Sequence, residues 1–198
     1  MGIDFWNERY ASQEYVYGKE PNDFFKECLE EQISGKILLV AEGEGRNAVY
    51  AAQRGWVVDA LDTSQKGMDK ALNLAKEKGV RINYVVDNIL FHQQKQDFYN
   101  LVGVFFLHLP RQQRRVFSLK MWESLKPGGK MIMEVFSKNQ LDFGTGGPKE
   151  LDLLYSEEEI ISDFPCFKIE VLQTIERKIH EGSRHNGHSS VIRFIGVK

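Results

Sequence analysis

The chain has 198 residues, of which 42% are hydrophobic and 27% charged, and its formal net charge at pH 7 is −2. These values predict one globular domain with a substantial core and exclude electrostatic attraction to nucleic acid as its main property. The apolar stretches are too short to span a membrane, and the opening MGIDFWNERY lacks the basic start and apolar core of a secretion signal, so we expect a cytoplasmic protein.

Strand and helix patterns alternate along the first two thirds of the chain. Apolar runs typical of strands lie at residues 37–41, 56–62, 82–87, 98–106 and 130–136. Helical patterns lie between them at residues 46–55, 64–79 and 111–125. Strands separated by helices at this rhythm are typical of a parallel sheet with helices on both faces.

The C-terminal part departs from this rhythm. Residues 168–179 alternate in polarity, residues 190–198 form another strand pattern, and the polar segment 180–189 lies between them. Two strands joined without a helix pair antiparallel. The sequence therefore predicts an α/β fold with a mostly parallel seven-stranded sheet, helices on both faces and a C-terminal antiparallel hairpin, in one domain spanning residues 1–198.

A glycine loop follows the first predicted strand. Its pattern Gly43-x-Gly45-x-x-Ala48, with Asp62 further along, fits the dinucleotide-binding fingerprint. The same geometry serves any adenosine cofactor at the carboxyl ends of parallel strands, because glycine lets the backbone approach a ligand closely. NAD would place its pyrophosphate at the helix N-terminus, whereas S-adenosylmethionine offers an amino acid, a sulfonium and a ribose.

Two acids at strand ends favour the methyl donor. Asp62, at the end of the second predicted strand, is placed to bind both ribose hydroxyls. Asp87, at the end of the third, suits the adenine amino group. The segment LKPGG then precedes the fifth strand, and the antiparallel hairpin follows it.

Six segments carry a resemblance to a known family: FWNERY, YVYGKEPNDFF, AEGEGRNAVYAA, LHLPRQQRR, LKPGG and FGTGGPKELDLLY. Together they resemble the seven-stranded, class I S-adenosylmethionine-dependent methyltransferases. Within that family they are most similar to the small bacterial branch of tellurite-resistance-type enzymes and relatives of thiopurine methyltransferase. The resemblance implies a Rossmann-like sheet core over residues 36–198, with residues 1–35 as an N-terminal lid and helical segment.

The resemblance also implies a cofactor and a site. The cofactor would be S-adenosyl-L-methionine, with S-adenosyl-L-homocysteine as the product. The expected cofactor-binding residues are Tyr17, Gly18, Glu42, Gly43, Gly45, Arg46, Asn47, Asp62, Thr63, Ser64, Met68, Asp87, Asn88 and Ile89. His108, after the fourth strand, lies where relatives place a residue facing the methyl group, and it is the candidate catalytic residue. A purely structural role for this histidine remains open.

The glycine loop departs from the family pattern acid-x-Gly-x-Gly-x-Gly. Leu39 stands in the place of the acid that helps to hold the cofactor's amino group, and Ala41 replaces the first glycine. Glu42, inside the loop, is the candidate substitute for that acid, because an acid beside a bound cation is electrostatically favoured; the alternative is a solvated loop charge. A cation such as Arg46 at a helix N-terminus opposes the helix dipole, so we expect it to pair with the cofactor carboxylate, a substrate anion or a nearby Glu.

Histidines near the C-terminus invite a metal-site hypothesis. His180, His185 and His188, with Cys166, match no ligand spacing typical of metal sites. We therefore expect no metal and interpret the segment as a solvated hairpin turn.

The reaction expected from the cofactor is transfer of an electrophilic methyl group to a small molecule. No general base is evident in the sequence, and a base is needed only when the acceptor must lose a proton. This favours a soft or already ionised acceptor, such as a thiol or a selenium, tellurium or arsenic species. Two alternatives remain open: a degenerate S-adenosylmethionine-binding protein without catalysis, and an NAD-dependent oxidoreductase, for which no Tyr-x-x-x-Lys set is found. We expect a monomer or homodimer with no nucleic-acid or membrane partner.

Overall fold

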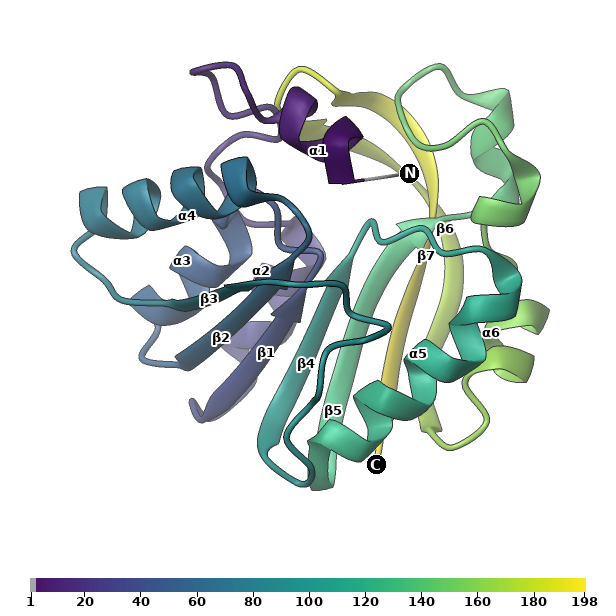
Figure 1. Cartoon of the computed structure of the whole chain (residues 1–198). Coiled ribbons are helices and arrows are strands. Elements are labelled where there is room, and N and C mark those ends of the chain that lie inside the picture. The colour runs from purple at the N-terminus through teal and green to yellow at the C-terminus, as the bar shows by residue number, and fades with distance from the viewer. Residues whose placement is uncertain (1–2) are drawn as a thin grey trace.

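The computed structural model describes residues 3–198, which form a seven-stranded sheet in the order β3-β2-β1-β4-β5-β7-β6 (Figure 1). The strands are β1 (Lys36–Val40), β2 (Val57–Asp62), β3 (Asn83–Val86), β4 (Tyr99–Phe105), β5 (Leu125–Phe136), β6 (Lys168–Glu181) and β7 (His185–Val197). Neighbours among β1 to β5 pair in parallel, and β7 pairs antiparallel with both β5 and β6. The predicted mostly parallel sheet with a C-terminal antiparallel hairpin is confirmed.

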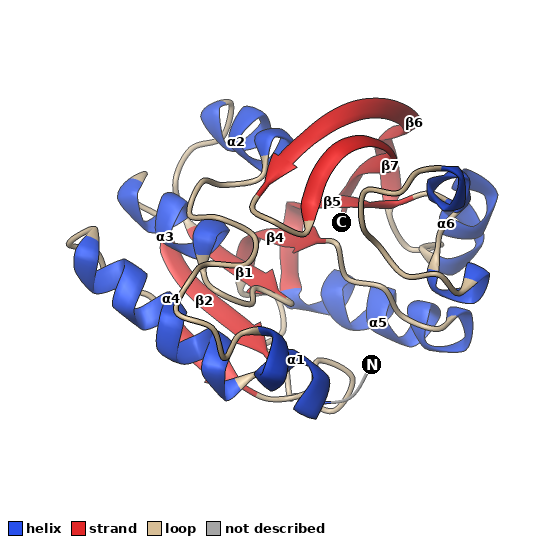
Figure 2. Ribbon diagram, turned by 90° about the horizontal axis from the view of Figure 1, so that it is seen from above, coloured by secondary structure: helices blue, strands red, loops and turns tan. Residues whose placement is uncertain are grey.

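Helices cover both faces of the sheet, as predicted. They are α1 (Ile3–Arg9), α2 (Asp23–Glu30), α3 (Arg46–Gln53), α4 (Gln65–Glu77), α5 (Arg111–Ser124) and α6 (Glu157–Asp163), with short 3-10 helices η1 (Lys138–Asp142) and η2 (Leu151–Leu153). Figure 2 shows α2, α3 and α4 on one side of the sheet and α5 and α6 on the other.

The central strand β1 explains the two cores. Its side chains alternate between the faces, so that Leu38 and Val40 pack in the core beneath α5 and α6. Ile37 and Leu39 pack in the core beneath α2 and α3. A strand buried on both faces has no polar side and therefore appears in the sequence as a continuous apolar run.

The segment before β1 divides into two parts. Helix α2 belongs to the core, because Phe25 and Leu29 are buried among sheet residues. Helix α1 instead packs on α4 and lies at the end of the molecule where the β6–β7 turn also lies (Figure 1). The part that can cover a site at the carboxyl ends of the strands is therefore the part before α2.

The C-terminal hairpin is longer than the sequence predicted. Strand β6 continues to Glu181 and β7 begins at His185, so that only residues 182–184 join them. The expectation of a solvated turn over 180–189 is wrong for Glu181 and His185, because both side chains are buried.

No helix within residues 3–198 is long and apolar enough to span a bilayer.

Candidate functional site

A cavity of about 800 Å³ lies at the carboxyl ends of the parallel strands. Its walls come from the N-terminal segment, the loop after β1, the ends of β2, β3 and β4, the loop at 144–148 and the β6–β7 turn. Ligands of open α/β sheets bind at this edge. Because small-molecule sites typically measure about 300–1,000 Å³, a cavity near the upper limit has room for a cofactor and a second small molecule.

The structure brings most of the sequence-predicted residues to this one cavity. Its lining includes Tyr17, Gly18, Glu42, Gly43, Arg46, Asn47, Asp62, Thr63, Asp87, Asn88, Ile89 and the candidate catalytic His108. Gly45, Ser64 and Met68 are not part of the lining. The glycine loop and the two strand-end acids, although far apart in the sequence, therefore face the same space.

The three residues outside the lining have structural surroundings of their own. A Cβ on Gly45 would lie 2.4 Å from the Cβ of Ala71, so this glycine permits α3 to pack on α4. Ser64 caps α4 by accepting a hydrogen bond from Gly67 N at 3.0 Å. Met68 lies within α4 and is partly buried.

The β1–α3 loop follows an unusual backbone path. Ala41, Gly43 and Gly45 have φ angles of +54°, +56° and +86°. Gly43 N donates a hydrogen bond to Asp62 Oδ2 at 2.9 Å, and Tyr84 Oη donates to Gly43 O at 2.6 Å. Ala41 adopts a backbone conformation that L-residues with a Cβ enter only at a cost, at the position where the family pattern has glycine.

Glu42 is buried at the base of the loop and does not carry a solvated charge. Its Oε1 accepts a hydrogen bond from Ala48 N at 2.7 Å, so it satisfies one free N–H of α3, whose N-cap Gly45 offers no side chain. Burial raises the pKa of Glu42 to about 7, although its backbone hydrogen bonds and Arg46 act in the opposite direction. The carboxyl group is therefore divided between its two protonation states at neutral pH.

The two strand-end acids differ in their surroundings. Asp62 accepts backbone hydrogen bonds from Gly43 N and Ser64 N, both at 2.9 Å, and burial raises its pKa. Because a carboxylate offers about four lone-pair sites, it keeps capacity for further donors. Asp87 is exposed and pairs with His92 at 2.8 Å, which lowers the pKa of Asp87.

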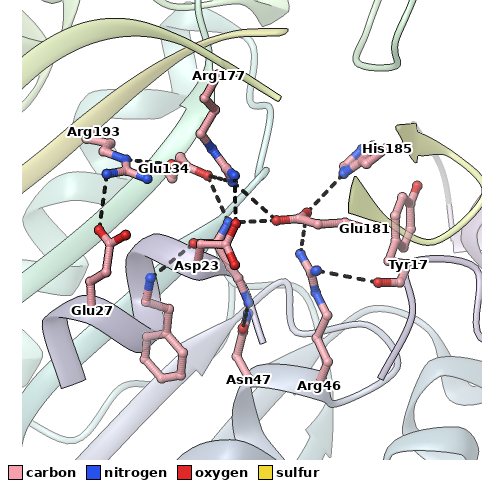
Figure 3. Close-up of polar contacts among 12 residues, drawn as sticks. Tyr17, Asp23, Glu27, Arg46, Asn47, Glu134, Arg177, Glu181, His185 and Arg193 are labelled. Carbon is pink, nitrogen blue, oxygen red and sulfur yellow. Dashed lines mark hydrogen bonds and ion pairs between the residues drawn. The ribbon is translucent and has the colours of Figure 1, made fainter. Parts of the chain in front are cut away.

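Arg46 is paired by a residue that the sequence analysis did not identify. Its Nη2 lies 2.7 Å from Glu181 Oε2, and its Nη1 donates to Tyr17 O at 3.4 Å (Figure 3). The sequence analysis expected Arg46 to pair with the cofactor carboxylate, a substrate anion or a nearby Glu, and the structure shows a Glu. Burial acts to raise the pKa of Glu181, but Arg46 and His185 hold it well below its usual range.

This ion pair continues into a buried network near the turn end of the β6–β7 hairpin (Figure 3). Glu134, fully buried on β5, accepts hydrogen bonds from Arg177 Nη2 at 2.6 Å and Arg193 Nε at 2.9 Å. Asn22 Nδ2 donates to both Glu134 Oε1 at 2.8 Å and Glu181 Oε1 at 3.0 Å. A buried carboxylate is tolerated only when it is paired in this way, so these residues fix one another's positions.

An aromatic wall of the cavity adjoins the network, because His185 contacts Glu181. His108 lies parallel to Phe136 at a centroid distance of 5.6 Å, and its Nδ1 lies 2.9 Å from Leu153 O. A carbonyl can only accept, so Nδ1 carries the hydrogen and Nε2 is an acceptor. Within residues 3–198, this buried Nε2 has no hydrogen-bond partner. Burial lowers the pKa of His108 to about 4, so the imidazole is neutral at pH 7.

His185 completes this wall. Its ring lies 4.6 Å from that of Tyr17, 4.7 Å from that of Phe106 and 5.3 Å from that of Phe136, measured between centroids. Burial lowers the pKa of His185 although Glu181 raises it.

The described residues contain no group of three or more His, Cys, Asp or Glu side chains arranged to hold a metal ion.

The sequence is similar to a known protein family and to curated proteins. Residues 37–129 match the family described as "Methyltransferase domain". The Ubiquinone biosynthesis O-methyltransferase of Coxiella burnetii is 28% identical over 116 residues, which cover 56% of this chain and 49% of that protein. The enzyme of the same name from Rickettsia felis is 28% identical over 111 residues, covering 56% of this chain and 45% of that protein. The chain thus matches about half the length of these curated relatives.

Three solved structures share the fold. A protein studied for the conversion of a disulfide bond into a thioacetal group during echinomycin biosynthesis has a TM-score of 0.79 at 16% identity, over 99% of this chain and 91% of that chain. TehB from Haemophilus influenzae has a TM-score of 0.72 at 14% identity, over 99% and 66%. The N-methyltransferase NodS from Bradyrhizobium japonicum, in complex with S-adenosyl-L-homocysteine, has a TM-score of 0.69 at 12% identity, over 99% and 97%.

Proposed function

We propose that the chain is an S-adenosylmethionine-dependent methyltransferase acting on a small molecule, because residues 37–129 match the family described as "Methyltransferase domain" and the chain shares the fold of a solved methyltransferase. The observation that carries the proposal is the convergence of the glycine loop and the acids Asp62 and Asp87 on one cavity. The cavity is large enough for the methyl donor and an acceptor together.

The residues present fit the cofactor. A Cβ on Gly43 would lie 2.6 Å from Tyr10 Oη, so glycine at this position lets the loop backbone and Tyr10 pack closely beside the cavity. Asp62, at the end of β2, keeps acceptor capacity for ribose hydroxyls. We propose that Glu42 takes the place of the absent strand acid toward the amino group, and that the segment up to Gly18 acts as the lid.

The bound cofactor would supply a methyl group made electrophilic by its sulfonium. The protein's contribution would be to bind and align the two reactants and to exclude water. Alignment of this kind can lower a barrier by about 7–11 kcal/mol. The buried aromatic wall and the N-terminal segment that covers the cavity are suited to excluding water.

The acceptor belongs to one of two classes, each supported by a different observation. A soft acceptor, such as a thiol or a selenium, tellurium or arsenic species, is supported by the resemblance of the sequence segments to tellurite-resistance-type enzymes. A protic acceptor is supported by the buried neutral His108 in the lining and by the curated relatives named O-methyltransferases. As further proposals, the protein is a single domain, cytoplasmic, and a monomer or homodimer.

Calorimetry with S-adenosylmethionine, S-adenosylhomocysteine and NAD tests the proposal. We expect both adenosyl compounds to bind and NAD not to bind. Binding of NAD alone would favour the oxidoreductase alternative. Binding of the adenosyl compounds without methyl transfer to thiols, selenite, tellurite or phenols would favour a degenerate binding protein.

A further inference from the structure

The two ends of the β6–β7 turn bring a carboxylate and an imidazole together. Glu181, the last residue of β6, is the register partner of His185, the first residue of β7. His185 Nδ1 lies 3.5 Å from Glu181 Oε2. Both side chains are buried, and His185 lines the cavity. The turn therefore presents a carboxylate–histidine pair to the space where an acceptor would bind.

This pair has a defined orientation. Glu181 is also held by Arg46, which contacts the same oxygen, Oε2, at 2.7 Å, and by Asn22, which donates to the other oxygen, Oε1, at 3.0 Å. An ionised carboxylate can only accept, so the hydrogen of the neutral ring lies on Nδ1 and the lone pair on Nε2. Nε2 contacts no hydrogen-bonding group in the described part of the chain, and its edge of the ring faces Gly146, which also lines the cavity.

The surroundings of His185 are apolar except for a few titratable groups. Tyr17, Phe106 and Phe136 enclose its ring. The charged groups that act on it are Glu181 from the hairpin, Arg46 from α3 and Arg9 from α1, with the neutral His108 beyond Phe136. Arg46 is already paired with Glu181, and the three aromatic rings around His185 suit a flat molecule.

We propose that His185, positioned by Glu181, accepts the proton of a neutral hydroxyl acceptor, so that the substrate is a flat, phenol-like molecule seated on this wall. The inference rests on the proposed function and selects its protic acceptor class. The acceptor oxygen forms a bond to the methyl carbon as the carbon–sulfur bond breaks and its electron pair stays on sulfur. The hydroxyl proton moves to His185 Nε2, and the resulting imidazolium is stabilised by Glu181 as in other carboxylate–histidine pairs.

Two acceptors of similar shape distinguish this role from a structural one. 4-Methylphenol is neutral at pH 7 and must lose its proton, whereas 4-nitrothiophenol is already anionic. We expect His185→Asn to lower kcat/KM for 4-methylphenol about 10²- to 10⁴-fold and to change that for 4-nitrothiophenol only a few-fold. His188→Asn, in the same strand but exposed, is the matched control and should leave both values unchanged.

The pH profile and the tautomer give readouts that a packing role would not change. For 4-methylphenol, kcat/KM should fall at low pH as His185 becomes protonated, and His185→Asn should remove that limb. Nitrogen NMR of the S-adenosylhomocysteine complex should show His185 with its hydrogen on Nδ1, and Glu181→Gln should shift the ring toward the other tautomer.

The possible failures are distinguishable. Equal loss with both acceptors, no loss with either, or wild-type protein that binds S-adenosylhomocysteine but does not methylate 4-methylphenol would each overturn the inference. The first two of these would leave the proposed function in place. Wild-type protein that binds neither S-adenosylmethionine nor S-adenosylhomocysteine would instead overturn the proposed function.

Discussion

Glu42→Gln changes the charge of a side chain at the base of the glycine loop without changing its shape. Burial raises the pKa of Glu42 from 4.5 to about 7, and at about 1.4 kcal/mol per pKa unit this rise corresponds to about 3 kcal/mol between its protonation states. At pH values between these two pKa values, Glu42 is protonated more often in the folded protein than in the unfolded chain. The contribution of Glu42 to the free energy of unfolding therefore falls as pH rises from about 4.5 through about 7.

Glutamine does not titrate, and its Oε1 can still accept the hydrogen bond from Ala48 N. We therefore expect the variant to match wild-type stability near pH 4.5 and to exceed it by up to about 3 kcal/mol near pH 8.5. Urea unfolding, followed by the fluorescence of the three Trp residues, measures this difference across the pH range. Glu44→Gln is the control, because it removes a buried carboxylate that pairs with Lys70 at 2.6 Å, and it should destabilise the protein.

The result that would refute this reasoning is a stability difference between Glu42→Gln and wild type that does not change with pH. The same variant tests the role of Glu42 toward a ligand. If Glu42 holds the cofactor's amino group, the variant should weaken S-adenosylmethionine more than an analogue without that group, in a double comparison of two proteins and two ligands. Equal weakening of both ligands would mean that Glu42 supports only the loop.

Three further predictions concern the walls of the cavity. Ala41→Gly should raise the free energy of unfolding by about 0.5–1 kcal/mol, because removing the Cβ relieves about 1–2 kcal/mol of left-handed strain and the added flexibility of the unfolded chain offsets part of it; unfolding in urea measures this, and a loss of stability would contradict it. Asp62→Ala should weaken S-adenosylmethionine by about 1–3 kcal/mol in calorimetry, and unchanged affinity in a folded variant would exclude the ribose role. Backbone amides from Tyr15 to Gly18 should exchange hydrogen more slowly with S-adenosylhomocysteine present, and equal exchange would leave this segment a fixed wall of the fold.

The order of strands and helices could be predicted because each element shows its own local pattern. The run at 37–40 is apolar throughout because β1 is buried on both faces, and Gly55 and Gly79 follow the ends of α3 and α4 with positive φ angles. The hairpin was predicted too short because its last residues are polar. Their burial depends on partners distant in the chain, which no local pattern shows.

The candidate site divides in the same way. The glycine loop, Asp62 and Asp87 could be found because each lies at the end of a recognisable strand or directly after one. Glu181 and His185 were missed because their meaning depends on the register of β6 with β7 and on contacts with Asn22 and Arg46. The one available signal was electrostatic: Arg46 at the start of a helix required an anionic partner, but the sequence did not specify which.

The strand order β5-β7-β6 has a consequence for how the molecule assembles. Strand β7 follows β6 in the chain, yet it lies between β5 and β6, so β6 cannot join the sheet before β7 does. Arg46 and Glu181 are 135 residues apart and Asn22 and Glu181 are 159 apart, and contacts of such separation form late and slowly. The glycine loop, whose contacts are with Asp62 and Tyr84, can therefore form before the wall that carries His185, because that wall requires β6 and β7 to pair.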